Sequence, residues 1–202
     1  MILGAGLTGY AQNEAMLNFV GTQEPGVLSP IYASIPGTIG WTFQPLTDIL
    51  VTALGAFDYD LPVGPVYIGL WDSAGDLLAS STMTSSSTLV NQSRYETIVP
   101  VTLTLDQTYY LGEFLPGGVL QAVAVNPSTS PYGYATMSPE IQLGNAAYEN
   151  NSDFGFPSAF DGSTGSAITG PNFQFEPVPE PAAFGLVGIS LLALLGTRRR
   201  MS

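Results

Sequence analysis

The stretch Val66-Tyr-Ile-Gly-Leu-Trp-Asp-Ser-Ala-Gly-Asp-Leu-Leu-Ala-Ser-Ser-Thr-Met83 predicts a β-hairpin. Two candidate strands, 66–71 and 76–83, flank a tetrapeptide that starts with Asp72 and ends with Gly75. A type I turn prefers Asp at its first position and Gly at its fourth, so this tetrapeptide suits the turn between two antiparallel strands. The stretch therefore favours an all-β fold.

Further strand patterns lie on both sides of this hairpin. Residues 48–57 are apolar on both faces and predict a central, buried strand, whereas residues 101–105 alternate apolar side chains with threonine. No segment before Ala182 shows a helical stripe of ten residues or more. We expect an antiparallel β-sandwich of jelly-roll type. The remaining strands are predicted at 15–20, 39–43, 95–99, 108–114, 119–125 and 172–175.

Residues 126–170 are rich in Asn, Ser, Pro and Gly, yet they contain several aromatic side chains. Aromatic residues in this number argue against plain disorder. We expect long loops with one or two short strands, folded over an end or edge of the sandwich. The aromatic residues are Tyr132, Tyr134, Tyr148, Phe154, Phe156 and Phe160.

The charge of the chain is distributed unevenly. All 16 acidic residues precede Arg198, Arg94 is the only basic residue among them, and the net charge of the 202 residues is −12. Such a surface repels nucleic acid and anionic lipid, because binding to phosphate needs a basic face. Neutral sugars and divalent cations are the partners that this field permits. Cysteine is absent, so no disulfide framework is available.

The C-terminus predicts a sorting and anchoring tail. Residues 176–181 form a Pro-rich spacer that ends in Pro179-Glu180-Pro181, residues 182–197 are apolar and uncharged, and residues 198–202 contain Arg198, Arg199 and Arg200. As a helix the apolar stretch would span about 24 Å, slightly less than the roughly 30 Å of a hydrocarbon core. The arginines would stay on the cytoplasmic side, which places the acidic body outside.

This order of motif, apolar segment and arginine cluster resembles the PEP-CTERM sorting signal of Gram-negative bacteria. The resemblance implies processing by an exosortase, a transpeptidase-like membrane enzyme, and many carriers of the signal occur in organisms that make exopolysaccharide. Residues 1–11 resemble the back half of a signal peptide, with small residues at Gly9 and Ala11 that suit cleavage before Gln12. The extracytoplasmic domain is then expected over residues 12–175.

The body also resembles a domain of unknown function that often precedes such tails. The shared segments are 41–43, 51–58, 69–75 with Leu78-Ala79, and 170–175. The resemblance implies a β-sandwich and no assigned chemistry.

The composition excludes most catalytic machinery. Histidine, cysteine and lysine are all absent, so the usual general base, thiol nucleophile and Schiff-base amine are missing. A pair of carboxylates, as in glycoside hydrolases, remains open, although no pair among the acidic residues has a distinguishing context. We assign no catalytic residue and expect a protein that is not an enzyme.

Two kinds of binding site remain open. Calcium could bind at Asp58 and Asp60 or in the loop 150–153, but such residues more often form turns through side-chain to backbone bonds, so we assign no metal ligand and no cofactor. Polysaccharide could stack on loop tyrosines, whereas Trp41 and Trp71 suit the core. The candidate tyrosines are Tyr59, Tyr132, Tyr134 and Tyr148.

These observations together predict an exported, non-enzymatic β-sandwich protein at the cell surface or in the extracellular matrix. It would be held in the membrane through its C-terminus until an exosortase-like enzyme processes it. The main alternative is a polysaccharide-binding module, with or without calcium, and a carboxylate-based glycoside hydrolase is a further one.

Overall fold

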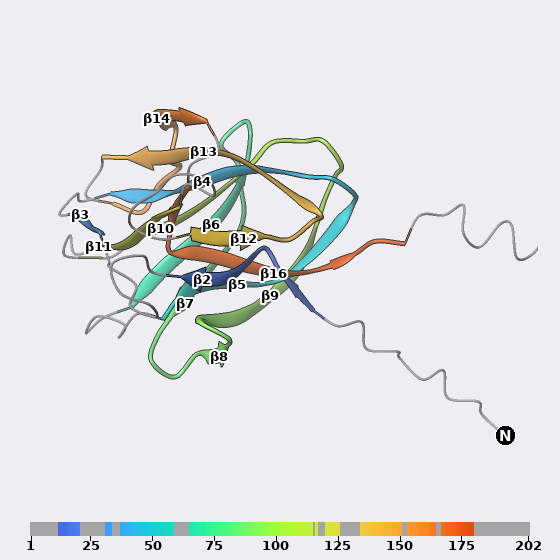
Figure 1. Cartoon of the computed structure of the whole chain (residues 1–202), viewed down its shortest axis with the longest axis horizontal. Helices are drawn as coiled ribbons and strands as arrows, with labels where there is room; N and C mark the ends of the chain where they lie inside the picture. The colour runs from blue at the N-terminus through green and yellow to red at the C-terminus, as the bar shows by residue number, and fades with distance from the viewer. Residues whose placement is uncertain are drawn as a thin grey trace, which may run out of the picture.

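The computed structural model describes residues 12–20, 31–33, 37–58, 65–114, 116, 120–125, 134–150, 153–164 and 167–179. All of the regular secondary structure in these ranges is β, and the strands in them pair antiparallel. The strands build a sandwich of two main sheets (Figure 1), so the predicted all-β, antiparallel class is confirmed. No helix in this part of the chain is long and apolar enough to cross a membrane.

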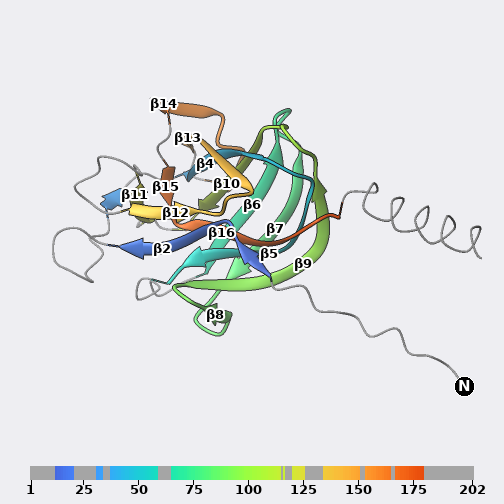
Figure 2. The same ribbon diagram turned by 45° about the vertical axis from the view of Figure 1, so that its right-hand side comes forward.

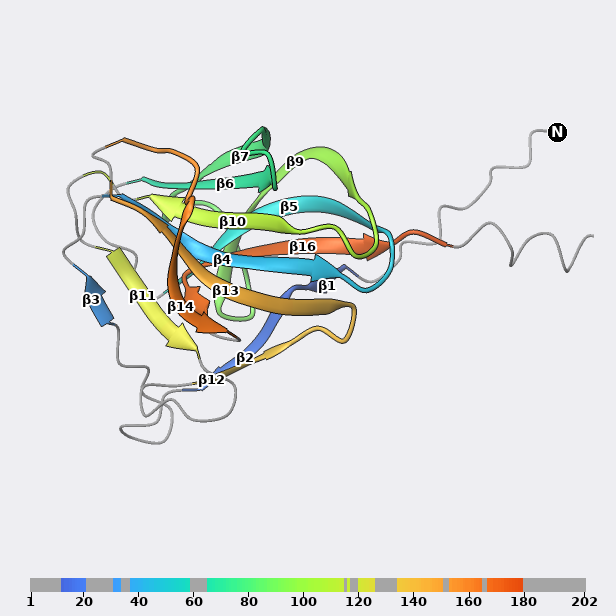
Figure 3. The same cartoon turned by 90° about the horizontal axis from the view of Figure 1, so that it is seen from above.

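The two main sheets contain five and six strands. The five-stranded sheet has the order β1 (Asn13–Glu14), β16 (Pro171–Pro177), β5 (Ile49–Phe57), β9 (Ser93–Leu103) and β8 (Thr88–Val90). The six-stranded sheet has the order β14 (Ala159–Thr164), β13 (Ile141–Glu149), β4 (Thr38–Pro45), β10 (Tyr109–Phe114), β6 (Val66–Asp72) and β7 (Leu77–Met83). Figure 3 shows β7, β6, β10, β4 and β13 side by side, with β9, β5 and β16 in the layer beneath.

Two smaller sheets lie at one end of the sandwich. One has the order β15 (Ala167–Thr169), β11 (Leu120–Val125) and β3 (Ile31–Ala33), and the other pairs β12 (Tyr134–Met137) with β2 (Met16–Val20). The predicted strands at 15–20 and 119–125 thus exist, but they belong to these small sheets.

Aromatic side chains fill the core between the two main sheets. Trp41 and Phe43 alternate inward from β4, Phe173 and Phe175 alternate inward from β16, and none of the four is exposed to solvent. The rings of Trp41 and Phe173 stack with centroids 6.1 Å apart, and the indole Nε1 donates a hydrogen bond of 3.0 Å to the carbonyl of Pro171. Buried aromatic pairs of this kind dominate the packing energy of a small sandwich, and the tryptophan N–H is satisfied.

The hairpin predicted from residues 66–83 is confirmed as β6 and β7. The amide of Gly75 donates to the carbonyl of Asp72 at 3.2 Å, which closes the turn. The carboxylate of Asp72 accepts hydrogen bonds from the amides of Ala74 at 2.9 Å and Asp76 at 3.0 Å. Asp72 therefore stabilises the turn that the sequence predicts at this position.

Strand structure is confirmed over 95–99 and 101–103, but the predicted break is wrong, because the chain forms one continuous strand, β9, which curves along the length of the sandwich (Figure 2). Its pairing with β5 shifts register so that Val51 faces Val101 and Ala53 faces Thr97. The residues between form a bulge in which Val99 is 86% exposed. Pro100 lies in this bulge, where a residue without an amide hydrogen costs the sheet nothing.

The expectation of long loops over residues 126–170 is also wrong. This region contributes β13, which pairs with β4 over nine residues inside the six-stranded sheet, and β12, β14 and β15 besides. The sequence did not predict β13 because several of its positions carry Gly, Asn and Ala, which are depleted in strands. The segment 153–158 covers a face of the sandwich rather than an end or edge: Phe154 and Phe156 pack on Trp71, on the side of β6 that points away from the core.

Candidate binding site

A groove lies on the outer face of the six-stranded sheet, over the adjacent strands β13, β4 and β10. It has a volume of about 230 Å³. We call it the outer-sheet groove and define it by its lining residues: Thr42, Phe43, Gln44, Thr108, Tyr110, Gln142, Leu143, Gly144, Asn145 and Phe160.

A β-bulge in β13 forms the floor of the outer-sheet groove. Leu143 faces Phe43 and Ala146 faces Trp41, so β13 uses one residue more than β4 between these two pairs. A side chain at Gly144 would collide with the hydroxyl of Thr42, so only glycine fits there. Bulges of this kind redirect side chains, and they are common beside functional sites.

Asn145 lies in this bulge. Its backbone amide donates a hydrogen bond of 2.8 Å to the hydroxyl of Thr42, which holds the bulge in place. Its side-chain oxygen Oδ1 is buried and has no hydrogen-bond partner among the residues that the structure describes. A buried acceptor left without a donor is costly, so this atom favours a ligand that donates a hydrogen bond.

Two aromatic rings form the apolar wall of the outer-sheet groove. Phe160 of β14 is 47% exposed, and its ring centroid lies 6.1 Å from that of Tyr110 on β10. The edge of Phe156 packs on Tyr110 with centroids 4.7 Å apart, and burial raises the pKa of the Tyr110 hydroxyl. Because the amide of Gly155 donates a 3.0 Å hydrogen bond to the hydroxyl of Thr38, the segment that holds Phe156 is fixed to β4.

Amide and hydroxyl groups supply the polar part of the outer-sheet groove. Gln142 is exposed, and Gln44 donates from Nε2 to the hydroxyl of Thr108 at 3.0 Å. None of the lining residues carries a charge at neutral pH. The groove therefore combines an aromatic wall with neutral hydrogen-bonding groups.

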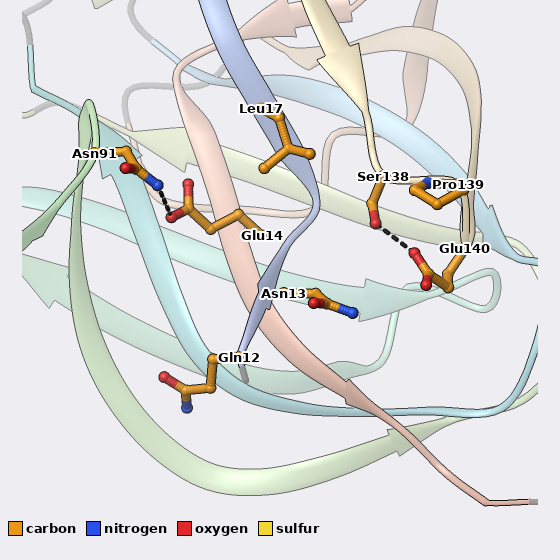
Figure 4. Close-up of a pocket in the computed structure, with 8 residues that line it drawn as sticks. All are labelled: Gln12, Asn13, Glu14, Leu17, Asn91, Ser138, Pro139 and Glu140. Atoms are coloured by element: carbon orange, nitrogen blue, oxygen red, sulfur yellow. Dashed lines mark hydrogen bonds between the residues drawn. The ribbon is translucent and has the colours of Figure 1, made fainter. Parts of the chain in front are cut away.

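A second pocket, of about 290 Å³, lies where β1 and β2 meet the turn between β12 and β13 (Figure 4). It contains two carboxyl groups, Glu14 and Glu140, and both already accept hydrogen bonds. Asn91 donates to Glu14 at 2.6 Å, and Ser138 donates to Glu140 at 2.5 Å. Figure 4 shows the two carboxyl groups pointing to these separate partners.

Glu14 belongs to a buried polar network as well as to this pocket. Burial raises the pKa of its carboxyl, although hydrogen bonds from Asn91 and Tyr95 act in the opposite direction. Tyr95 in turn accepts a 2.7 Å hydrogen bond from the side chain of Asn172. The network ties β1, β9 and β16 together, so Glu14 has a structural role in the described part of the molecule.

The sorting residues predicted from the sequence are mostly beyond the described residues. Pro179 is exposed at the end of the described chain. Glu180, Pro181, Arg198, Arg199 and Arg200 lie outside the described residues, as do the apolar stretch 182–197 and residues 1–11.

The calcium candidates are divided in the same way. The carboxylate of Asp58 pairs with Arg94 at 2.9 Å, while Asp60, Asn151 and Ser152 lie outside the described residues. Within the described ranges, no group of three or more acidic side chains could hold a metal ion. Calcium binding at these loops stays an open alternative.

The tyrosine candidates and the tryptophans occupy different places. Trp41 and Trp71 are buried, as expected, although Trp71 faces the covering segment 153–158 rather than the space between the sheets. Tyr148 packs against the core, Tyr134 belongs to β12, and Tyr59 and Tyr132 lie outside the described residues.

Sequence reasoning missed the residues that line the outer-sheet groove. One signal was available: Tyr109 and Tyr110 are consecutive in a strand, so one of the two rings must face away from the core. No such signal showed that Phe160 and Asn145 line the same groove as Tyr110, because those two residues come from a region whose strands were not predicted.

Most of the chain matches a known protein family. A family model described as a domain of unknown function (DUF4082) matches residues 22–166, which include all the residues that line the outer-sheet groove. No curated protein and no solved structure matches the chain.

Proposed function

We propose that this chain, which belongs to the DUF4082 family of domains of unknown function, is an exported cell-surface protein that binds polysaccharide without transforming it. The outer-sheet groove is the observation that supports this function best. Its aromatic wall and its neutral amide groups are the two kinds of surface that a sugar needs.

The chemistry of the outer-sheet groove suits a pyranose ring. One face of such a ring presents C–H groups, which pack on the exposed ring of Phe160 as they would on any aromatic face. The hydroxyl groups at its edge both donate and accept hydrogen bonds, and Gln142 and Asn145 offer both kinds of partner. Tyr110 is already held by Phe156, so its side chain loses little conformational freedom when a ligand binds.

We also propose the jelly-roll type for this sandwich. From β4 to β10 the chain crosses repeatedly between the two main sheets: β4, β6, β7 and β10 lie in one, and β5, β8 and β9 lie in the other. The crossings between sheets are what this architecture requires.

Export and anchoring rest on the sequence of the two ends. β1 pairs with β16 so that Asn13 faces Phe175, and the described chain therefore begins and ends at neighbouring points of the sandwich. Because Ala15 and Met16 are fully buried, the residues soon after position 11 belong to the folded domain, which suits cleavage before Gln12. The spacer then leaves the fold at Pro177–Pro179, where a membrane enzyme would reach it.

We expect the mature protein to end near Pro179–Pro181 and to be recovered outside the cell. The measurement is the intact mass of the protein from fractions of its bacterial host. A form that ends at Ser202 and needs detergent for extraction would mean a plain membrane anchor. A full-length soluble form in the cytoplasm would contradict the proposal of export.

Removing the exposed ring of the groove is expected to weaken binding. Phe160→Ala should raise the Kd for a bound polysaccharide about tenfold, or about 1.4 kcal/mol. Tyr110→Phe keeps its ring and should bind within about threefold of the wild type. Affinity electrophoresis measures both.

Leu89→Ala is the matched control for Phe160→Ala. Leu89 is 50% exposed and lies on β8 of the other sheet, so its loss should leave binding unchanged. Equal binding by the wild type and Phe160→Ala would place the ligand somewhere other than this groove.

A carboxylate-based glycoside hydrolase is the second candidate, because Glu14 and Glu140 line one pocket and have different surroundings. A buried acid of raised pKa beside a second carboxylate is the pattern of an acid–base pair. Loss of a measured glycosidase activity in both Glu14→Gln and Glu140→Gln would favour it. Full retention of that activity in either variant would exclude this pair.

A further inference from the structure

We propose that the outer-sheet groove takes an uncharged polysaccharide, discriminates against acidic ones and needs no metal ion to bind. This inference rests on the proposed function and names the class of its ligand. It follows from three features of the groove: an unpartnered acceptor, the absence of charge in its lining, and the position of the nearest cations.

The buried oxygen of Asn145 is the first feature. Oδ1 accepts no hydrogen bond from the residues that the structure describes, and the adjacent hydroxyl of Thr42 is engaged with the backbone of Asn145. An atom of this kind is satisfied only by a donor. A sugar hydroxyl donates, whereas a carboxylate or a sulfate only accepts, so an acidic group placed here would meet a second acceptor.

The charge of the lining is the second feature. The ten lining residues include no Arg, Lys, Asp or Glu. An acidic polysaccharide therefore has no cation to pair with in the groove, and a calcium ion has no carboxylate there through which it could bridge to the ligand. A neutral ligand needs neither of these partners.

The position of the only cation in the body is the third feature. Arg94 belongs to β9 of the other sheet, where it pairs with Asp58 at 2.9 Å and donates to the carbonyl groups of Ser85 and Ser87, each at 2.9 Å. These contacts hold its guanidinium group at the other sheet, so Arg94 offers no cation to a ligand in the outer-sheet groove of a chain whose net charge is −12. Long-range repulsion acts against anionic chains and leaves neutral ones unaffected.

Affinity electrophoresis of the full-length protein tests this inference directly. The gels contain either a neutral chain, hydroxyethyl cellulose or galactomannan, or an acidic chain, alginate or polygalacturonate. Each gel is run with calcium and with EDTA. We expect at least one neutral chain to retard the protein at least tenfold more strongly than either acidic chain, with no effect of EDTA.

Asn145→Leu removes the unpartnered acceptor and keeps a side chain of similar size. It should weaken the binding of the neutral chain about tenfold, while Asn150→Leu, at an exposed asparagine after the end of β13, should leave binding unchanged. Circular dichroism of both variants shows that the fold is intact before binding is compared.

The outcomes separate this inference from the proposed function. Equal or stronger retardation by alginate or polygalacturonate, or a requirement for calcium, would overturn the inference and leave polysaccharide binding intact. Wild-type binding by Asn145→Leu would likewise overturn the role of its oxygen. No retardation by any of the four chains would overturn both proposals.

Discussion

Asn172→Ala is expected to lower the free energy of unfolding by about 3–5 kcal/mol, because it leaves several buried polar groups without partners. The side chain of Asn172 is fully buried in β16 and works as a connector. Its oxygen accepts from the amide of Met16 at 3.0 Å, and its nitrogen donates to the carbonyl of Met16 at 3.1 Å. The side chain thus pairs with β2 as a neighbouring strand would.

The same side chain also supports the polar network behind the second pocket. Its nitrogen donates to the hydroxyl of Tyr95 at 2.7 Å, and Tyr95 hydrogen-bonds Glu14. Burial, followed by the charge of Glu14, raises the pKa of Tyr95, so this hydroxyl stays protonated and remains a donor. Alanine at position 172 would remove one partner from β2 and one from β9 at the same time.

Chemical denaturation of the full-length protein measures this effect, and Asn150→Ala is the control. Asn150 is exposed, so the same change there should alter the free energy of unfolding by less than about 0.5 kcal/mol. A loss below about 1 kcal/mol for Asn172→Ala would mean that water replaces the missing amide, and the proposed role as a connector would be wrong.

Glu113→Gln is expected to stabilise the fold by roughly 3–5 kcal/mol at pH 8 and by about 1 kcal/mol or less at pH 5. Glu113 of β10 lies between Ile39 and Ile68 of the neighbouring strands and is 2% exposed. Its carboxyl oxygen Oε1 has no hydrogen-bond partner among the described residues, and Gly170 lies directly against the carboxyl group. Burial raises the pKa of this carboxyl to about 8.

The direction of the pH dependence follows from this shift. Below the ordinary pKa of 4.5, Glu113 is protonated in both the folded and the unfolded chain, and it costs no stability through ionisation. As the pH rises from 4.5 to about 8, the unfolded chain releases the proton and the folded chain keeps it. The stability of the wild type therefore falls through this range, and glutamine, which does not ionise, removes the fall.

Thermal or chemical unfolding at a series of pH values checks this prediction. Asp153→Asn changes an exposed carboxyl and should keep the pH dependence of the wild type. An equally steep fall of stability in Glu113→Gln would show that other groups cause it.

Most strands of the two main sheets could be predicted from the sequence, because their residues carry a local signal. The hairpin at 66–83 has two candidate strands joined by a turn with Asp72 and Gly75 in the preferred positions. β5 was predicted as central and buried, and it indeed lies between β16 and β9. In each case propensity, pattern and turn chemistry favour the same structure.

The groove could not be predicted in the same way, because no local pattern encodes it. Its floor depends on a bulge whose register is set by the pairing of β13 with β4, about a hundred residues apart in sequence. Its wall depends on the approach of Phe160 to Tyr110 from different strands. The residues next to Gly144 and Asn145 in sequence predict neither the bulge nor the approach of Phe160 to Tyr110.

The sequence by itself determined the all-β class, the turn at Asp72–Gly75 and the acidic character of the body, because each of these depends on residue types within a few positions or on composition. Only the tertiary structure decided that Glu113 is buried between isoleucines, that Asn172 joins β2 to β16, and that a bulge leaves the oxygen of Asn145 without a donor. The physical reason is that burial and hydrogen-bond satisfaction are properties of surroundings, which distant strands create only when the sheets pack together.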